Sequence, residues 1–358
     1  MKNLFTVVCA AFALLVVPAI AMGHELNDPS EPGSVLVFPK FLRGTVRTEQ
    51  GILAATEIEI SVTCPSGSTC ADGQGVTLRA HWVCPAEFNR TVGVVGPCRE
   101  TDFTVRTTVR GSAYFTPEGD GQAPFNVTVP AAPCDGGYLI VWVVNNFGQP
   151  IKFDGLIGDA VIRQGPFDAA AYNAIPIQAV SSLATNALVS LGPTGSLVFD
   201  GLDGHYKAAT GTIIGTVRYD RLATTTSAPI QTSLTLLTLD VRSNNFNFPT
   251  FADLNFYTTG EALVSTETFF FCWEEVRLRE INSVLTENFM GRKGLVQSTQ
   301  AEKVPILGFA DTAGPVTLLG LVETNEFVPR DDDGSILLRS FMYSLYNDST
   351  PVPTQFVP

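Results

Sequence analysis

The sequence predicts an all-β protein made of two antiparallel β-sandwich units, Ig-like or jelly-roll-like, with one or two short helices. The first observation is that apolar and polar residues alternate along many short segments, which is the period of a half-buried strand. The second is that Asp-Gly pairs, which suit the left-handed backbone of tight hairpin turns, recur between those segments. These pairs begin at Asp72, Asp120, Asp135, Asp154, Asp200, Asp203 and Asp333.

The chain begins with a predicted secretory signal peptide, residues 1–21. Lys2 precedes an apolar run over residues 4–17, and the small-residue pattern Ala-Ile-Ala follows. This order is typical of an export signal, here cut before Met22. The run is nearly long enough for a membrane anchor, but Pro18 and the small residues favour cleavage. We therefore expect a secreted protein, extracellular or periplasmic, with no membrane span in the mature chain.

Residues 22–166 are predicted to form the first sandwich unit, which is rich in disulfides and half-buried strands. Segment 76–84 shows the alternation clearly, because its apolar residues fall on one face and its polar residues, His81 among them, fall on the other. Such a strand has one buried face and one solvent face. Three other segments are apolar on both faces, which places them in the middle of the layered structure. They are 138–144, 234–239 and 269–273.

Residues 167–194 are predicted to be an Ala-rich linker that contains a short helix. Asp168 is suited to cap this helix, which runs through Tyr172 and stops at Pro176. Residues 195–358 then form the second sandwich unit.

The second unit is predicted to contain another short helix over residues 282–290, which ends before Gly291. Its opening, residues 195–199, echoes residues 33–38 of the first unit. This echo leaves open whether the two units arose by duplication.

An even number of cysteines in an exported chain predicts three disulfides. Spacing favours one bond between Cys64 and Cys70 and another between Cys84 and Cys98, each closing a short loop. The remaining bond, Cys134 with Cys272, then ties the two units together. Six cysteines permit 15 pairings, so the pairing itself stays open. A zinc site is disfavoured because the chain has no Cys-x-x-Cys pair.

Composition excludes some classes of partner. The net charge is −13, and the longest basic cluster is the pair at 292–293. Nucleic acids and anionic membrane surfaces are therefore poor partners, since both need clustered Lys and Arg. The chain is 45% hydrophobic and holds 24 Phe against 3 Trp. Phe in such number points to a core or to protein contacts rather than to sugar platforms.

No catalytic constellation is found, so the chain is not predicted to be an enzyme, and no cofactor is expected. Its three histidines are not accompanied by the Gly-x-Ser-x-Gly turn that presents a hydrolase serine. Glu57 and Glu59 share one strand face, but alternating acids are ordinary on a solvent face.

Two binding alternatives remain. Calcium accepts irregular oxygen sites, which makes four aspartates in two acidic turns candidate ligands: Asp200, Asp203, Asp331 and Asp333. A glycan is the other alternative, with Phe246 and Phe248 as candidate contacts in a stretch where Asn and Phe alternate.

The function predicted from the sequence is that of a secreted structural, adhesive or assembly protein that acts through surface contacts. Protein partners or self-association are expected, and a carbohydrate-binding module and a calcium-stabilised surface protein are the alternatives. The apolar segment 336–343 is the expected contact, as a strand that pairs with a neighbouring molecule's sheet edge. Deletion of residues 336–358 is accordingly expected to leave a folded chain.

Overall fold

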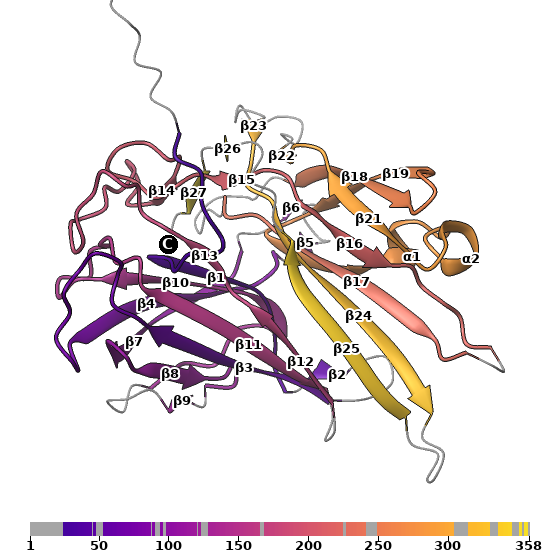
Figure 1. Ribbon diagram of the computed structural model, residues 1–358, viewed down its shortest axis with the longest axis horizontal. Helices are drawn as coiled ribbons and strands as arrows, with labels where there is room; N and C mark the ends of the chain where they lie inside the picture. Colours follow the sequence, from indigo (N-terminus) through magenta and orange to yellow (C-terminus); the bar gives the residue numbers. More distant parts are fainter. Residues whose placement is uncertain are drawn as a thin grey trace, which may run out of the picture.

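A computed structural model of the chain confirms the all-β, antiparallel class. Strands account for 56% of the structure and helices for 3% (Figure 1). The sheets form a four-blade, propeller-like arrangement, so two separate sandwiches are not clearly distinguished. The structure describes residues 24–44, 46–47, 53–86, 88–89, 94–95, 98–119, 121–122, 128–164, 168–224, 227–240, 249–303, 314–329, 336–345, 351–352 and 354–356.

Two large sheets come from the first half of the chain. Sheet 1 has the order β13-β1-β10-β4-β7, with strands β13 (Ile175–Ile177), β1 (Val35–Leu42), β10 (Gly136–Val144), β4 (Gly75–Val83) and β7 (Glu100–Thr108). Sheet 2 has the order β12-β11-β3-β8-β9, with β2 also on β3. Its strands are β12 (Asp168–Asn173), β11 (Leu156–Gln164), β3 (Leu53–Val62), β8 (Ser112–Phe115), β9 (Gly121–Gln122) and β2 (Val46–Arg47).

Two further large sheets come from the second half. Sheet 3 has the order β16-β21-β18-β22-β23, with β19 also on β18. Its strands are β16 (Ile214–Arg218), β21 (Lys293–Ser298), β18 (Thr250–Thr258), β22 (Glu302–Lys303), β23 (Gly314–Pro315) and β19 (Leu263–Phe270). Sheet 4 has the order β20-β17-β24-β25, with strands β20 (Trp273–Arg277), β17 (Ile230–Leu237), β24 (Leu319–Pro329) and β25 (Ile336–Leu345).

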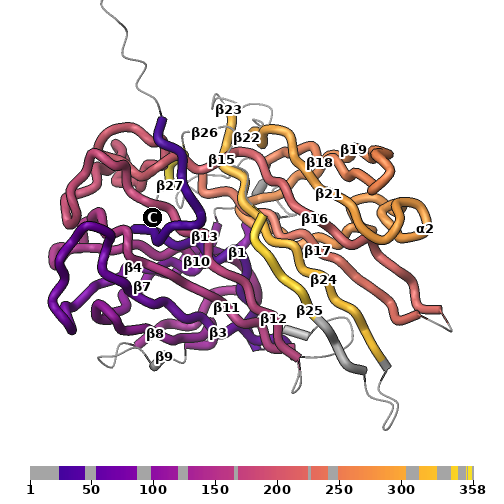
Figure 2. The backbone as a smooth tube through the Cα atoms, viewed as in Figure 1, coloured from indigo at the N-terminus to yellow at the C-terminus, as the bar shows by residue number. Residues whose placement is uncertain are grey.

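Short paired strands bring the end of the chain back to the middle of the molecule. β14 (Leu197–Phe199) pairs with β27 (Thr354–Phe356), and β15 (Ala209–Thr210) pairs with β26 (Pro351–Val352). Figure 2 shows β27, in yellow, close to the indigo and magenta strands of the first half. A separate short pair is formed by β5 (Phe88–Asn89) and β6 (Val94–Val95).

Two of the three segments predicted to be apolar on both faces, 138–144 and 234–239, lie in the middle of the layers. The prediction for the third, 269–273, is wrong, because Phe269 is 60% exposed near the end of β19. In β10, Leu139 and Val141 pack into the cluster that fills the space between sheets 1 and 2. The intervening Ile140 and Trp142 pack into a second cluster, which includes residues of both halves of the chain. A strand that is buried on both faces does not alternate between apolar and polar residues, because neither face contacts water.

The predicted linker helix is wrong, because residues 168–173 form strand β12 and residues 175–177 form strand β13. β12 pairs with β11 along its whole length, and Ala170 and Tyr172 are buried on one face while their neighbours are exposed. Tertiary pairing therefore outweighs the helix preference of the Ala run.

Helical structure does occur near the second predicted position. α2 (Glu287–Met290) ends at Gly291, which has φ 76° in the left-handed region that glycine favours. α1 (Leu278–Ile281) precedes it. The predicted segment 282–290 is therefore helical only over its last turn. No helix among the described residues is long and apolar enough to span a membrane.

All six cysteines of the mature chain form disulfides, but only one predicted pairing is correct. Cys64 bonds Cys70 as expected. The other bonds join Cys84 with Cys134 and Cys98 with Cys272. Cys84 packs in the cluster on one side of sheet 1 and Cys98 in the cluster on the other side, so these two cannot meet.

The carboxy-terminal strands are part of the core, which overturns the expectation that the chain folds without residues 336–358. Leu345, Val352 and Phe356 are fully or almost fully buried. β25 pairs with β24 along all its length, and the Ser344 hydroxyl donates to the Asn173 carbonyl at 2.9 Å. The carboxy-terminal part of β25 therefore lies against β12 and is not a free edge.

A buried lysine joins the two halves. Lys40 of β1 is 2% exposed, and its Nζ lies 2.6 Å from Glu275 of β20 and 2.5 Å from Glu323 of β24. Gln164 and Asn325 donate hydrogen bonds to the second oxygen of Glu323, at 2.6 and 2.9 Å. One cation from sheet 1 is thus enclosed by anions from sheet 4.

The cluster stays ionised in spite of its burial. Burial alone would lower the pKa of Lys40, but the two glutamates raise that pKa above its ordinary value. Burial alone would raise the pKa of Glu323, but Lys40 and the hydrogen bonds from the amides lower it. The buried charges of Lys40 and Glu323 are therefore stable only when the two halves of the chain are packed together.

We expect Lys40→Met to lower the free energy of unfolding by about 3–5 kcal/mol, because it leaves Glu323 buried without its cation. Urea denaturation of residues 22–358 measures this loss. The double change Lys40→Met with Glu323→Gln is expected to recover part of it. Arg163→Met, which breaks an exposed ion pair with Glu57, serves as the control and should cost about 1 kcal/mol or less. Equal small losses for Lys40→Met and the control would contradict this account.

We expect the disulfide that links the two halves to contribute most to stability. Cys98 and Cys272 are separated by 174 residues, and Cys64 and Cys70 by 6. Loop-closure entropy then gives about 5 kcal/mol for the long loop and about 2 kcal/mol for the short one. Paired Cys→Ala changes at each bond, compared by urea midpoint, test this order, and a larger loss at the short loop would refute it.

Candidate functional site

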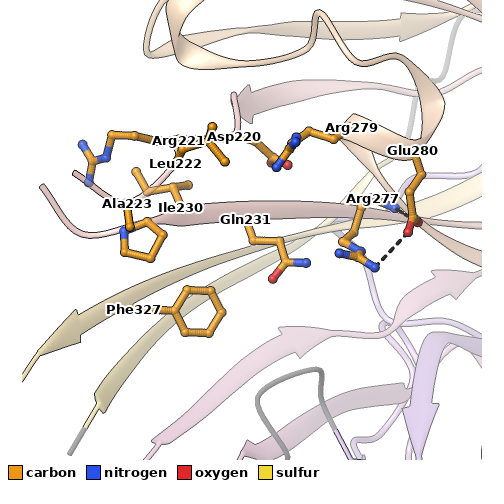
Figure 3. A pocket seen from close by; sticks show the side chains of 11 residues that line it. Asp220, Arg221, Leu222, Ala223, Ile230, Gln231, Arg277, Arg279, Glu280 and Phe327 are labelled. Atoms are coloured by element: carbon orange, nitrogen blue, oxygen red, sulfur yellow. Dashed lines mark hydrogen bonds and ion pairs between the residues drawn. The ribbon is translucent and has the colours of Figure 1, made fainter. Parts of the chain in front are cut away.

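A cleft of about 520 Å³ opens where β16, β17, β24 and α1 meet (Figure 3). Its polar lining is charged, and its apolar lining comes from the β16–β17 connection and from β24. The described lining residues are Asp220, Arg221, Leu222, Ala223, Pro229, Ile230, Gln231, Arg277, Arg279, Glu280 and Phe327.

Asp220 is the buried acid of this cleft. It is 4% exposed, and its Oδ1 accepts a hydrogen bond of 2.8 Å from the Thr232 backbone N–H. Burial raises the pKa of Asp220 to about 6, against the smaller lowering effects of the Thr232 hydrogen bond and of Arg279 and Arg277. The carboxyl therefore changes its charge near neutral pH.

The arginines of the cleft differ in how far they are already neutralised. Arg221 lies 3.2 Å from Glu326 and 3.6 Å from Glu287. Arg277 lies 2.8 Å from Glu280, the contact drawn as a dashed line in Figure 3. Arg279 is exposed, and its side chain points toward Asp220 in the same view.

This arrangement is suited to ionic contacts more than to nucleophilic chemistry. No Ser, Thr, Cys, His or Tyr is present among the described residues that line the cleft. An acid with a raised pKa can exchange a proton, but the described lining supplies no hydroxyl, thiol or imidazole nucleophile beside it.

The second candidate is the outer face of sheet 3. Alternate residues of β18 point into the core, where Ala252, Leu254 and Phe256 are buried. Their neighbours therefore point to the opposite side, together with residues of β16, β21 and β19 that the strand register places beside them. We define the outer face by its apolar members, Ile214, Phe251, Tyr257, Leu263, Phe269 and Leu295.

The apolar residues of the outer face lie at the edge of the sheet as well as in its middle. Phe269 is 60% exposed and Leu263 is 52% exposed, both on the edge strand β19. The rings of Phe251 and Phe269 lie 5.9 Å apart, between centroids. Polar residues of β18 and β19 separate the two apolar ends, and among them the Ser265 hydroxyl donates to Asn255. Exposed apolar residues such as Phe269 and Leu263 are candidates for a protein contact.

Of the four predicted calcium ligands, the structure describes Asp200 and Asp203, and each is hydrogen-bonded to its own neighbours. The Asp200 carboxylate accepts from the Leu202 N–H at 2.9 Å and lies 2.9 Å from Nδ1 of His205. Asp203 accepts from the Ser182 hydroxyl at 2.5 Å. No group of three or more metal-binding side chains occurs within the part of the chain that the structure describes. Asp331 and Asp333, and the glycan candidates Phe246 and Phe248, lie outside the described residues.

His81 is buried although the pattern of its strand places it on a polar face. It is 2% exposed, its ring stacks on Trp142 with centroids 4.9 Å apart, and Phe356 of β27 packs against it. Glu100 lies 3.3 Å from Nδ1. The second half of the chain covers the face that would otherwise meet water.

Glu57 is committed to an ion pair. Arg163 donates two hydrogen bonds to its carboxylate, at 2.6 and 2.9 Å, and these hold the pKa of Glu57 below its ordinary value. Glu57 therefore lacks the raised pKa that a glycosidase acid needs.

Sequence reasoning missed both candidate sites. The cleft is assembled from residues about 100 positions apart, and Asp220 shows no local motif. The edge strand β19 carries a detectable signal, because alternation over 263–270 leaves Leu263 and Phe269 on the polar face.

Comparisons with known proteins give no family. No family model matches the chain, and no curated protein matches it. Similar solved structures include a viral chemokine binding protein encoded by rodent gammaherpesvirus Peru, with 11% identity, 92% of this chain and 89% of that chain covered, and a TM-score of 0.13. Another is the structure of infectious bursal disease virus Gx strain, with 8% identity, coverage of 92% and 75%, and a TM-score of 0.13. Likeness at this level carries no argument about fold or function.

We expect Asp220 to make stability depend on pH. Because its folded pKa of about 6 exceeds the ordinary 3.8, its contribution favours folding at low pH and is lost as pH rises through about 6. Ionised Asp220 then costs up to about 3 kcal/mol near neutral pH. Asp220→Asn, which keeps an acceptor for the Thr232 N–H, should raise Tm at about pH 7.5 and have little effect at about pH 4.

Thermal melting across this pH range measures the effect. Asp72→Asn is the matched control, because Asp72 is an exposed acid in an ion pair with Arg110. A gain for Asp220→Asn that is the same at both pH values would refute the assignment.

Proposed function

We propose that this chain is an exported structural protein that assembles with copies of itself through the outer face of sheet 3 and its edge strand β19. Export is supported by the signal pattern of residues 1–21 and by three disulfides, which form in oxidising compartments. The observation that carries the proposal is that Phe269 and Leu263 are exposed on β19, whose outer edge pairs with no strand that the structure describes.

We further propose to describe the scaffold as two sandwich-like units, 22–166 and 195–358, with β12 and β13 of the segment 167–194 completing the sheets of the first unit. One apolar cluster fills the space between sheets 1 and 2, and a separate one fills the space between sheets 3 and 4. The seam cluster, which includes residues of both halves, makes the units a single rigid support for the outer face.

The described residues support assembly better than they support catalysis, glycan binding or calcium binding. The charged cleft lacks a nucleophile, which disfavours acyl transfer there. The outer face offers Phe, Leu and Ile with a single Tyr, whereas glycan platforms favour rings with a polar group. Calcium binding has no described ligand cluster in its support.

We expect residues 22–358, produced in an oxidising compartment, to form dimers or larger assemblies whose mass increases with protein concentration. Light scattering behind size exclusion measures this. Leu263→Gln with Phe269→Gln should shift the protein to monomer, because the change removes the exposed apolar contacts of β19.

Phe147→Gln is the matched control, since Phe147 is 88% exposed but lies in the loop between β10 and β11. It should assemble like the unmodified chain. A protein that stays monomeric at every concentration would overturn the proposed function, and so would assembly that persists in the Leu263 and Phe269 variant.

A further inference from the structure

The hydrogen bonds between β18 and β19 determine which residues of β19 direct their backbone N–H and C=O groups toward its free edge. β19 pairs with β18 from Leu263 to Phe270, and no described strand pairs with its other side. The Thr258 N–H donates to the Ala262 carbonyl at 2.9 Å at the start of this ladder. In an antiparallel ladder, hydrogen-bonded and non-hydrogen-bonded pairs alternate. Even-numbered residues of β19 therefore bond to β18, and the odd-numbered residues 263, 265, 267 and 269 direct their N–H and C=O groups outward.

Other sheet edges carry features that discourage pairing between molecules. β7 has three charged residues, Glu100, Asp102 and Arg106, and β20 has two adjacent glutamates. β13 is short and contains Pro176, and β25 lies against β12. Charge, proline, short length and coverage all protect an edge. β19 has eight residues and only one charge, Glu267, so none of these devices protects it well.

We propose that two copies of this chain pair through β19, antiparallel, around a two-fold axis at Thr266. This inference rests on the proposed function and specifies its first contact. The two copies of sheet 3 then form one continuous sheet, and the outward backbone groups of each β19 are satisfied by those of the partner. The pairs are Leu263 with the partner's Phe269 and Ser265 with the partner's Glu267, each occurring twice by symmetry.

This register matches side chains as well as backbone. Leu263 meets the partner's Phe269, which joins the exposed apolar residues of both copies into one stripe on the outer face. Ser265 meets the partner's Glu267, so the single charge of each β19 lies opposite a small neutral side chain and not opposite a like charge. Every odd-numbered residue from 263 to 269 has a partner, and all of them belong to hydrogen-bonded pairs, as the phase of the ladder requires.

The neighbouring registers are worse. A shift of two residues in one direction places Glu267 opposite the partner's Glu267, and like charges directly opposite destabilise a sheet. A shift in the other direction places Phe269 opposite the partner's Glu261, which has φ 64° and lies in the turn before β19. A shift of one residue is excluded because it would oppose outward backbone groups to inward ones.

Disulfide cross-linking of single cysteines placed on β19 tests the register of the proposed dimer directly. In the proposed dimer, Thr266 faces its own copy in a non-hydrogen-bonded pair, with Cα atoms about 4.5 Å apart. Thr266→Cys should therefore form a covalent dimer under mild oxidation, because that spacing suits a disulfide. Ser265→Cys and Glu267→Cys are the matched controls, because their like residues would lie about 8 Å apart and should cross-link little.

Charge changes at Ser265 test the same geometry in solution. Ser265→Glu places a second carboxylate opposite the partner's Glu267 and should raise the dimer Kd about fivefold or more. Ser265→Lys places an ammonium there and should lower the Kd by a similar factor. Sedimentation velocity measures both, and opposite effects from one position cannot come from a loss of folding.

The outcomes separate this inference from the function on which it rests. If the unmodified chain assembles but Ser265→Cys or Glu267→Cys cross-links in place of Thr266→Cys, the register is wrong and the proposed function stands. If the chain assembles and none of the three cross-links, pairing through β19 is refuted. If the chain stays monomeric, both proposals fail.

Discussion

The charge of Lys40 sets a constraint that the rest of the structure must meet. An ammonium group buried in β1 costs several kcal/mol unless anions and hydrogen-bond acceptors surround it. Those anions, Glu275 and Glu323, come from sheet 4, so sheet 1 is complete only when the second half of the chain is in place. The seam is then apolar around this cluster and is closed by the bond between Cys98 and Cys272. The ion pairs of Lys40 specify how the two halves of the chain align, and the apolar contacts between the halves provide most of the stability of their contact.

A rigid seam leaves the periphery of sheet 3 as the place where the molecule meets others. β18 and β19 lie at the end of the molecule away from the first half (Figure 1). Their inner residues share one cluster with sheet 4, so an external contact on β19 is supported by a packed core beneath it. The central strands β1, β10 and β17 of sheets 1 and 4, in contrast, are buried on both faces. Strands that are buried on both faces cannot contact another molecule, so association is possible only at strands that are buried on one face.

Several features of the fold follow from local patterns, and others depend on partners that the pattern does not name. The two-faced apolar run of β10 and the turn at Gly291 are visible in the sequence because period and glycine chemistry are local. The Ala-rich segment 168–173 is not, since pairing with β11 decides it. The disulfide partners of Cys84 and Cys98 are also not visible in the sequence. These two cysteines lie on opposite sides of sheet 1, and the folded chain alone determines on which side each one lies. At the candidate sites, the apolar pattern of 269–273 predicts a buried Phe269, whereas the side chain is exposed on an edge strand. Asp220 and the arginines meet only in the folded chain.

The return of the chain end to the middle of the molecule also determines the order in which folding can finish. Synthesis from the amino terminus completes β1, β4 and β10 long before β27. Until residues 354–356 arrive to pair with β14, the side of sheet 1 that holds His81 and Trp142 lacks Phe356 as its cover. The first half therefore keeps an incomplete apolar surface until the last strand is in place, and a chain that ends before β27 never covers it with Phe356.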